Sequence, residues 1–440
     1  MSEFETMKYF KKAFIVTFLF ITVNTQAQLS ILNLEEPHEE GELIIKMRKE
    51  SLSGINLLNQ ELQALGSIQM KSLNSNGLFL NKFSNTENLE SIAAKISEFE
   101  DVEYVELNHH HYLQSTPDDP GFLSQYGLSN VALPGADISA EEAWSVTRGS
   151  RKVLVGVIDT GVDYMHPDIN PNYWVNTGEY GRDSRGRDKR NNGIDDDGNG
   201  YVDDYKGWDF YSNDNDPMDK HKHGTHVAGI IGAKGNNGKG ITGVSWSVSL
   251  VGLKVFSDNG RYTRTDALVS AINYASRMGI SITNNSWGSN IYSRSIKDAV
   301  SLAESKGHLF VAAAGNESSN NDSRPFYPAS YELSNIISVG ASNSRDQLAS
   351  FSNYGHNSVD IAAPGDDIYS TLPGGRYGYL SGTSMAAPFV AGVAALIKSQ
   401  NSSRSAASIK SKIFNGADSV RNLNGRIRSS KRLNAYKAVK

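Results

Sequence analysis

The pattern of hydrophobic and polar positions divides the chain near residue 120. Before that point, short strand-like runs alternate with two amphipathic helical segments. The strand-like runs are 42–47, 67–72, 77–83 and 102–107, and the helical segments are 55–65 and 89–99. Their order, βαββαβ, is typical of a ferredoxin-like α+β unit. The proline-containing linker 115–120 follows and marks a boundary.

From about residue 140, near-continuous apolar runs alternate with helical segments. The apolar runs are 153–158, 250–256, 280–284 and 309–314, and the helical segments are 266–278 and 295–306. Strands that are apolar on both sides predict a parallel sheet covered by helices on both faces. The stretch 170–215 is polar and rich in Gly, Asp and Asn, so we expect a long loop with a function or a bound ion.

The first 27 residues have the layout of an export signal. Lysines precede the apolar run Ala13–Val23, and the small polar segment 24–27 follows it. This layout predicts a secretory signal peptide that is cleaved after Ala27. The apolar run is short for a membrane span, although a retained anchor is the alternative. We expect an exported protein, secreted or periplasmic, with no membrane attachment after cleavage.

The composition excludes several classes of function. The 440 residues include no cysteine, which removes thiol catalysis, disulfides and sulfur-based zinc sites. A net charge of -5 gives no basis for nucleic acid or an anionic membrane as a partner. An exported protein without disulfides needs another source of rigidity, and a bound metal ion is one candidate.

Three short segments place a polar side chain at the end of a buried element. Asp159 ends the apolar run 153–158, and the carboxyl ends of parallel strands are where sites form. His223 opens a helix of small and apolar residues. Ser384 begins another, whose N-terminal N–H groups and dipole favour negative charge near its oxygen. Pro388 falls near the first turn of that helix, where a missing N–H costs least.

Each segment alone has a simpler interpretation. Asp159 could cap the turn that follows it, and Ser384 could be an ordinary helix N-cap. His223 and His226, three residues apart, could bind zinc in a hydrolase, although no nearby glutamate completes a metalloprotease helix.

Together, the three segments resemble one family. The motifs are VIDTG around Asp159, HGTHVAG from His223 and SGTSMAAP around Ser384. In this chain order they resemble the motifs of subtilisin-like serine proteases, the subtilases. The resemblance implies a three-layer, subtilisin-like α/β catalytic domain at 116–440. It also implies that the ferredoxin-like unit, at 28–115, is an inhibitory propeptide.

The resemblance also implies roles for single residues. Asp159, His223 and Ser384 would form the catalytic triad, and Asn316 would donate to the oxyanion, with Asn285 as a rival. The peptide-binding positions would be Ser286, Trp287, Gly288, Ala313, Ala314 and Gly315. Trp287 and the small residues of the opposite wall favour apolar or aromatic substrate side chains. Asp322 in the adjacent loop could change this preference.

Calcium is the expected cofactor. Oxygen-bearing residues and one glycine resemble the start of an EF-hand loop: Asp195, Asp197, Asn199, Gly200 and Asp203. Lys206 stands where the loop's last glutamate would be, so Asp204 or another acid must complete the shell. The alternative is a solvated acidic turn. Asp168 and the loop around Asn237 match a second calcium position of the family.

We therefore expect a serine endopeptidase that acts on polypeptides as a monomer. It would be made as a precursor with its own propeptide as an intramolecular inhibitor, cleaving itself between His111 and Pro120. The histidines of Asn108–His111 are expected on or just after the last propeptide strand, with metal binding as the alternative. A catalytically silent, calcium-stabilised binding protein is the alternative function.

Overall fold

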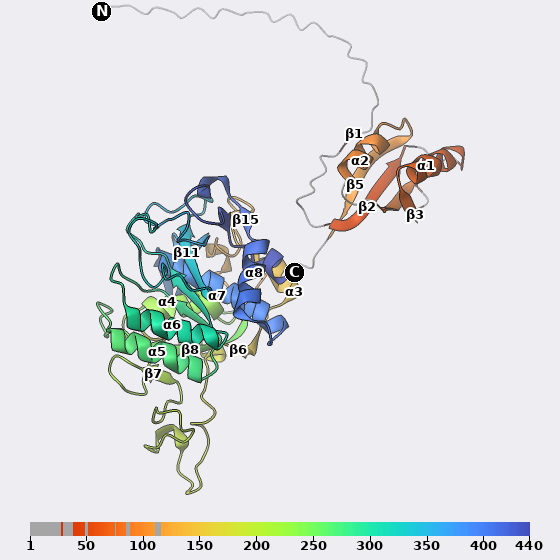
Figure 1. The fold of residues 1–440 in the computed structure, drawn as a ribbon. Coiled ribbons are helices and arrows are strands. Elements are labelled where there is room, and N and C mark those ends of the chain that lie inside the picture. Colours follow the sequence, from red (N-terminus) through yellow and green to blue (C-terminus); the bar gives the residue numbers. More distant parts are fainter. Residues whose placement is uncertain (1–27, 30–37, 49–51, 75, 85–88, 111–115) are drawn as a thin grey trace, which may run out of the picture. The chain divides into compact units, whose positions relative to one another are not determined.

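The computed structural model describes residues 28–29, 38–48, 52–74, 76–84, 89–110 and 116–440. The chain forms two compact units, Met1–Tyr112 and Leu113–Lys440 (Figure 1). Within the described ranges, no helix is long and apolar enough to cross a membrane. The predicted signal peptide, 1–27, and His111 at the start of the predicted cleavage region lie outside the described residues.

The first unit is a five-stranded sheet with two helices. Its elements are β1 (Gln28–Leu29), β2 (His38–Met47), α1 (Leu52–Ala64), β3 (Ser67–Asn74), β4 (Leu78–Phe83), α2 (Leu89–Ser97) and β5 (Val102–His109). The strand order is β1-β5-β2-β4-β3, and β1, which the sequence did not predict, pairs parallel to β5. Every second residue of β2 enters the core, as at Leu43 and Ile45, and packs with Leu62 of α1 and Ile96 of α2.

The second unit is built on a nine-stranded sheet of order β15-β16-β12-β11-β10-β9-β6-β8-β7. The strands are β6 (Gly149–Asp159), β7 (Gly207–Asp209), β8 (Ser247–Lys254), β9 (Ile282–Asn285), β10 (Leu309–Ala313), β11 (Ile336–Ser342), β12 (Ile361–Pro364), β15 (Asp418–Ser419) and β16 (Lys431–Arg432). All neighbouring strands run parallel except β15 and β16. The four strands that the sequence predicts, β10, β9, β6 and β8, are adjacent in the middle of the sheet.

Helices cover both faces of this sheet. They are α3 (Ala140–Val146), α4 (His223–Gly232), α5 (Thr265–Arg277), α6 (Arg294–Ser305), α7 (Thr383–Gln400), α8 (Ala406–Gly416) and α9 (Ala435–Val439). Short 3-10 turns lie at Phe122–Ser124, Asn170–Asn172, Lys189–Asn191 and Arg421–Leu423, and a hairpin joins β13 (Ile368–Leu372) to β14 (Arg376–Leu380).

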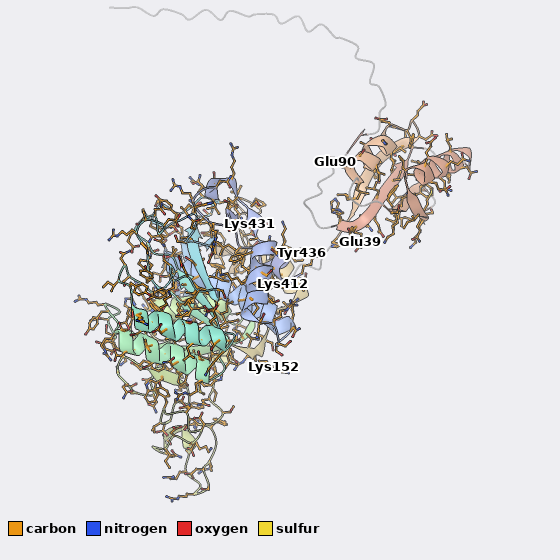
Figure 2. The ribbon with its side chains drawn as sticks, viewed as in Figure 1. Glu39, Glu90, Lys152, Lys412, Lys431 and Tyr436 are labelled. Atoms are coloured by element: carbon orange, nitrogen blue, oxygen red, sulfur yellow. The ribbon has the colours of Figure 1, made fainter. Side chains whose placement is uncertain are left out.

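Successive residues of β6 enter different cores. Val155 and Val157 pack with α4 and α7, whereas Ile158 packs with α5 and α6, which lie side by side (Figure 1). Charged residues such as Glu39, Glu90 and Lys152 project from the surfaces of the two units (Figure 2). The predicted three-layer α/β fold is confirmed.

The register of the sheet brings three strand ends together. Ile158 of β6 pairs with Asn285 of β9, which pairs with Ala312 of β10. Because the strands are parallel, the residues that follow these positions leave the sheet at the same edge. That edge carries the residues of the candidate site.

Candidate active site

Asp159 and His223 form the central contact of the site. Asp159 ends β6 and is 1% exposed, and its Oδ1 accepts hydrogen bonds from His223 Nδ1 and from the Thr160 N–H, both at 2.7 Å. The imidazole, 26% exposed, therefore keeps Nε2 for proton transfer. Among the described residues, no donor reaches the buried Oδ2 of Asp159.

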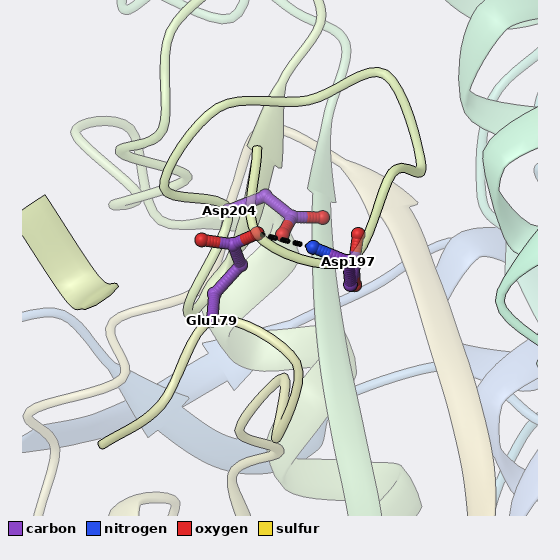
Figure 3. A group of neighbouring side chains, drawn as sticks. All are labelled: Glu179, Asp197 and Asp204. Atoms are coloured by element: carbon purple, nitrogen blue, oxygen red, sulfur yellow. Dashed lines mark hydrogen bonds between the residues drawn. The ribbon is translucent and has the colours of Figure 1, made fainter. Parts of the chain in front are cut away.

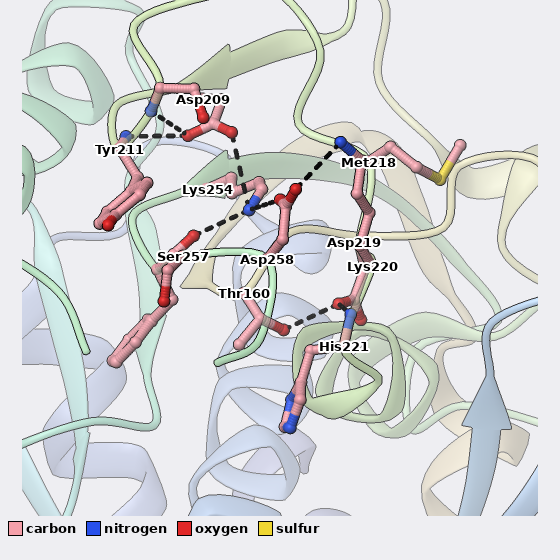
Figure 4. A network of polar contacts seen from close by, with 12 residues as sticks. Thr160, Asp209, Tyr211, Met218, Asp219, Lys220, His221, Lys254, Ser257 and Asp258 are labelled. Carbon is pink, nitrogen blue, oxygen red and sulfur yellow. Dashed lines mark hydrogen bonds and ion pairs between the residues drawn. The ribbon is translucent and has the colours of Figure 1, made fainter. Parts of the chain in front are cut away.

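A second carboxylate, Asp219, ties the start of α4 to the end of β6. Asp219 is buried and accepts from Thr160 Oγ1 at 3.0 Å and from Thr225 Oγ1 at 2.6 Å (Figure 4). Thr160 Oγ1 in turn accepts from the Gly224 N–H at 2.9 Å. A Cβ at Gly224 would lie 2.0 Å from the Gly161 carbonyl oxygen, so this close approach requires glycine.

The charge of His223 is set by its surroundings. Burial, the largest single influence, disfavours the imidazolium, but the charge and hydrogen bond of Asp159 and the charge of Asp219 outweigh it and raise the pKa of His223 above its usual value. The site therefore stabilises the protonated ring that a general base becomes after it accepts a proton.

His226 is a structural residue. Its ring is fully buried, with Nε2 at 3.0 Å from the Ile368 carbonyl and 3.1 Å from the Gly378 carbonyl of the β13–β14 hairpin. Burial lowers its pKa to about 3, so the ring stays neutral. Because His226 bonds to this hairpin and His223 to Asp159, the structure does not support the hypothesis that the two histidines bind zinc.

A buried ammonium lies close to this network. Lys254 at the end of β8 is 1% exposed and pairs with Asp258 at 3.0 Å and Asp209 at 3.6 Å (Figure 4). It also donates to the Phe256 carbonyl at 2.8 Å. Its charge is therefore compensated by one carboxylate at the end of β7 and one in the loop after β8, as buried charges require.

Ser384 is the second residue of α7, which begins at Thr383. Its Oγ donates to the Ser286 carbonyl at 3.2 Å, and no hydrogen bond joins it to His223 within the described part of the chain. Bonds between a nucleophile and its base are commonly loose without substrate and tighten when it binds.

Pro388 lies further along α7 than the sequence indicated. The helix begins at Thr383, so Pro388 falls in its second turn and leaves the Ser384 carbonyl without its N–H partner four residues on. Ser286 Oγ donates to that carbonyl at 2.8 Å, and Asn284 Nδ2 donates to Ser286 Oγ at 2.8 Å. Side chains at the end of β9 thus replace the lost helix bond and hold Ser384.

Asn316 is oriented by the start of the same helix. Its Oδ1 accepts from the Thr383 N–H at 2.8 Å and from Thr383 Oγ1 at 2.9 Å. The residue is exposed, and within the described ranges its Nδ2 has no acceptor. The rival Asn285 is fully buried and its Nδ2 bonds to the carbonyls of Thr283 and Val311, both at 3.2 Å. Asn285 therefore serves the core of the sheet.

The predicted peptide-binding positions follow the ends of β9 and β10, with one difference. The indole of Trp287 is 8% exposed and packs edge-to-face on Phe310 of β10, so this side chain belongs to the core. Ser286–Gly288 can therefore offer a peptide its backbone but not the indole. Opposite, Ala313–Gly315 is buried and small.

Asp322 is occupied elsewhere. Its Oδ1 accepts from Ser358 Oγ at 2.7 Å, and its Oδ2 accepts from Asn357 Nδ2 at 3.3 Å. These bonds tie two loops together, so Asp322 is not a free carboxylate for basic substrate side chains.

An acidic group in the insert is the candidate metal centre. Glu179, Asp197 and Asp204 each offer a carboxylate oxygen, all within 4.8 Å of one another (Figure 3). Glu179 Oε1 accepts from the Asp196 N–H at 2.6 Å, whereas its buried Oε2 has no partner among the described residues. Burial raises the pKa of Glu179 to about 7, and the charges of Asp204 and Asp197 add to this rise, against the lowering effect of the Asp196 and Asp197 N–H groups.

Neutral groups hold the acidic group in place. Asn176 Nδ2 donates to Asp204 Oδ1 at 2.6 Å and to Asp197 Oδ2 at 2.9 Å. Tyr274 OH donates to Asp204 Oδ2 at 2.5 Å. These three carboxylates suit a hard cation such as calcium, which takes six to eight oxygen ligands.

The ligand set differs from the one that the EF-hand spacing predicts. Of the five residues at the EF-hand-like spacing, Asp197 alone belongs to the acidic group, and Asp204, which the sequence offers to complete the shell, belongs to it as well. Asp195 accepts from the Gly200 N–H at 2.7 Å, and Asp203 accepts from the Gly193 N–H at 3.1 Å. Asn199 directs its Nδ2 to Asp204 at 2.8 Å. These groups stabilise turns of the loop, while Glu179, which the sequence spacing missed, comes from a preceding segment.

Asp168 lies outside the acidic group. It is fully buried and accepts from Asn237 Nδ2 at 3.1 Å, from the Ile241 N–H at 3.0 Å and from Tyr377 OH at 2.9 Å. The predicted proximity of Asp168 to the loop around Asn237 is present, with the carboxylate bonded to three donors.

Comparison with known proteins places the chain in a family. The subtilase family model matches residues 150–433. The chain is 36% identical to a thermophilic serine proteinase of Bacillus sp. (strain AK1) over 94% of this chain and 91% of that protein. It is 38% identical to thermitase of Thermoactinomyces vulgaris over 74% of this chain and 99% of that protein. A solved protease from Pseudoalteromonas arctica PAMC 21717 is 28% identical, with a TM-score of 0.60 over 74% of this chain and 99% of that one. The chain belongs to the subtilase family and is a serine-type endopeptidase.

Proposed function

We propose that this protein is the precursor of an exported endopeptidase that cleaves peptide bonds through Asp159, His223 and Ser384. The observation that carries the proposal is the 2.7 Å hydrogen bond between Asp159 Oδ1 and His223 Nδ1 at the sheet edge that also meets Ser384. The contact of Ser384 Oγ with the Ser286 carbonyl, which follows the neighbouring strand β9, supports the same arrangement.

In the proposed reaction, His223 Nε2 takes the proton of Ser384 Oγ as that oxygen attacks the peptide carbonyl carbon. Asp159 holds the proton on Nδ1 and stabilises the imidazolium. His223 then gives its proton to the leaving amine, and the peptide C–N bond breaks to leave an acyl-enzyme. Water attacks the ester by the same proton transfers and releases the carboxylate product.

Negative charge on the carbonyl oxygen needs donors that are already in position. Asn316 Nδ2 and the Ser384 N–H at the start of α7 are the proposed pair. The bonds of Asn316 Oδ1 to Thr383 support this role because they fix the amide before substrate arrives. Donors that are already oriented need little reorganisation when the negative charge develops, so little free energy is spent on it.

The proposed substrate is an extended polypeptide, bound by a monomer. Its backbone would pair with Ser286–Gly288, and the side chain before the cleaved bond would enter between that segment and Ala313–Gly315. The adjacency of β9 and β10, with Asn285 opposite Ala312, supports this placement. No nucleic acid or membrane partner is proposed.

Residues 28–115 are proposed to act as an inhibitory propeptide after the signal peptide, 1–27, is removed. The separate hydrophobic core of the first unit supports an independent role for it. A parallel sheet folds slowly because its contacts are distant in sequence, and a propeptide would assist that step. Self-cleavage would occur between His111 and Pro120.

Calcium is proposed to bind Glu179, Asp197 and Asp204. The unpartnered Oε2 of Glu179 supports this, since a cation would compensate the buried charge. The ion would supply structural cross-linking of the insert. A second site at Asp168 is also proposed, on the loop contacts that Asn237 makes with it.

Mass spectrometry of the wild-type chain and of Ser384→Ala, both expressed from residue 28, tests the proposal. Loss of the 28–115 segment from the wild type alone would support a nucleophilic Ser384 and self-processing. Identical processing of both would contradict self-processing. A wild-type protein that stays intact and does not react with a fluorophosphonate probe would contradict the proposed mechanism.

A further inference from the structure

Phe326 lies directly against Gly288, the last residue of the proposed peptide-binding segment. A Cβ added to Gly288 would stand 2.3 Å from Phe326 Cε1 and 2.9 Å from its Cζ. Position 288 must therefore be glycine for the edge of the ring to reach the backbone. The ring is 8% exposed and occupies the space that a side chain at 288 would otherwise take.

The chain holds Phe326 there at several points. Ser289 and Tyr327 exchange two backbone hydrogen bonds, of 2.7 and 2.8 Å, which attach the segment of Phe326 to the one that follows Gly288. The Phe326 N–H donates to Ser330 Oγ at 3.1 Å, and the Ser330 N–H donates to the Phe326 carbonyl at 2.9 Å. These bonds hold the backbone of Phe326 in place, so its ring stays beside Gly288.

The packing of Phe326 is unusual for a buried phenylalanine. The neighbouring side chains Trp287, Ala329 and Tyr331 belong to the core beside α5 and α6, whereas Phe326 belongs to none of the hydrophobic clusters of the described chain. It is buried against glycine backbone at the edge of the proposed cleft. This placement indicates a role in shaping the cleft more than in filling the core.

We propose that Phe326 determines substrate specificity by shortening the pocket for the side chain that precedes the cleaved bond, so that small residues such as alanine are preferred. This inference rests on the proposed function. The Ser286 carbonyl accepts a hydrogen bond from Ser384 Oγ, the proposed nucleophile. Gly288 is two residues further, so its Cα is about 6.6 Å from that of Ser286 if the chain is extended. A ring in contact with Gly288 would occupy space that a substrate aromatic ring needs, whereas the methyl group of alanine needs far less of it. This proposal replaces the expectation, based on Trp287, that the protein prefers apolar or aromatic substrate side chains.

Hydrolysis of matched peptides tests this proposal. The substrates are two succinyl-Ala-Ala-Pro-X p-nitroanilides with X as Ala or Phe, assayed with the full chain after processing. We expect wild-type kcat/KM to favour Ala by about tenfold or more, since pocket fit is worth roughly 10–200-fold. In Phe326→Ala, the ratio of the Phe to the Ala substrate should rise at least about tenfold. Phe414→Ala, a partly buried phenylalanine of α8, is the matched control and should leave the ratio unchanged.

Binding of the same peptides to Ser384→Ala separates this proposal from the proposed mechanism. We expect Ser384→Ala to bind the Ala peptide more tightly than the Phe peptide, and the double variant Ser384→Ala/Phe326→Ala to bind the Phe peptide more tightly. This result would support the proposed role of Phe326 even if the wild type cleaved neither substrate. In that case the proposed mechanism alone would fail. A wild type that cleaves the Phe substrate better, or a ratio that Phe326→Ala does not change, would overturn the role of Phe326. Should Phe326→Ala not fold, Phe326→Leu should raise the same ratio by a smaller factor.

Discussion

The proposed catalytic edge, formed by Asp159, His223, Ser384 and Asn316, and the acidic group of the insert both contain buried carboxylates, but they balance the charge differently. At the edge, Asp159 has the imidazole of His223 as a partner that can become a cation. Nearby, the buried Lys254 pairs with Asp209 at the end of β7 and with Asp258 in the loop after β8. Among the described residues, the side chains that donate to the acidic group are neutral, such as Asn176 and Tyr274.

This difference separates a site that the chain completes itself from one that a ligand must complete. Hydrogen bonds from strand ends and helix starts orient each group of the catalytic edge before substrate binds. In the acidic group, the buried Oε2 of Glu179 has no partner in the part of the chain that the structure describes, and an uncompensated buried charge is costly. Activity should therefore be sensitive to substitution of single side chains at the proposed catalytic edge, whereas the stability of the insert should depend on the concentration of metal ion.

The largest effect is expected at Asn316, the proposed oxyanion donor. Asn316→Ala should lower kcat by about 10²–10³, with little change in KM, because the lost bond forms fully only in the transition state. Steady-state kinetics on one peptide substrate measure it. Asn401→Ala, at the end of α7 away from the site, is the control and should behave as wild type. An unchanged kcat in Asn316→Ala would contradict the assignment.

Metal removal should affect stability next most. An ion at 100 times its Kd contributes about 2.7 kcal/mol, so a chelator should lower Tm by about 4 °C for a domain of this size. Scanning calorimetry with excess calcium and with chelator measures the shift. Glu179→Gln should reduce the calcium-dependent part of the shift. Asp188→Asn removes the charge that pairs with Arg190, outside the acidic group, and should retain it. Indifference of the wild type to chelator would refute the calcium proposal.

The pH profile should report the charges around His223. Its neutral form is the base, so kcat/KM should rise with pH through an apparent pKa above about 6.5. Asp219→Asn removes a charge that raises this pKa, so the acidic limb should move to lower pH. Asp298→Asn, exposed on α6, should not move it. A limb that stays fixed in Asp219→Asn would show that Asp219 does not influence the base.

The contribution of His223 to the free energy of unfolding should fall as the pH rises, whereas kcat/KM should increase with pH. Because the folded-state pKa of His223 is raised, the pairing of its imidazolium with Asp159 stabilises the fold fully below about pH 6.5. That contribution is lost as the pH rises through the folded-state pKa. Urea unfolding of Ser384→Ala with and without His223→Ala, from pH 5 to 9, should show the contribution only at the acidic end.

The smallest effect is expected for the hydrogen bond from Ser286 Oγ to the Ser384 carbonyl. Ser286→Ala should cost about 1–3 kcal/mol of unfolding free energy, because the buried Ser384 carbonyl loses its donor. Pro388→Ala supplies an N–H to that carbonyl, so the double variant should recover part of the loss. Urea unfolding in the Ser384→Ala background measures the four-variant cycle. Additive effects would mean that Ser286 and Pro388 do not share this carbonyl.

Much of the fold followed from local patterns. Apolar runs located the four central strands within a few residues, because residues buried on both faces of a sheet leave an unambiguous signature. The strand β1 was not found, since a two-residue strand carries no period. Pro388 was placed in the wrong turn because helix starts are uncertain by one or two residues.

The candidate site shows the same division. Motifs around Asp159, His223 and Ser384 marked these residues because each ends or begins a buried element, and such positions are readable along the chain. The inward turn of Trp287 and the ring of Phe326 on Gly288 were not readable, since Phe326 reaches the cleft only through the pairing of Ser289 with Tyr327.

The sequence by itself determined the family, the α/β class, the identity of the triad candidates and the existence of an oxygen-rich loop. Only the tertiary structure decided which carboxylates meet and which side chains bound the cleft. Glu179 joins Asp197 and Asp204 through bonds between different segments of the insert. The physical reason is that a local motif specifies backbone conformation over a few residues, whereas charge compensation and pocket depth depend on groups that only folding brings together.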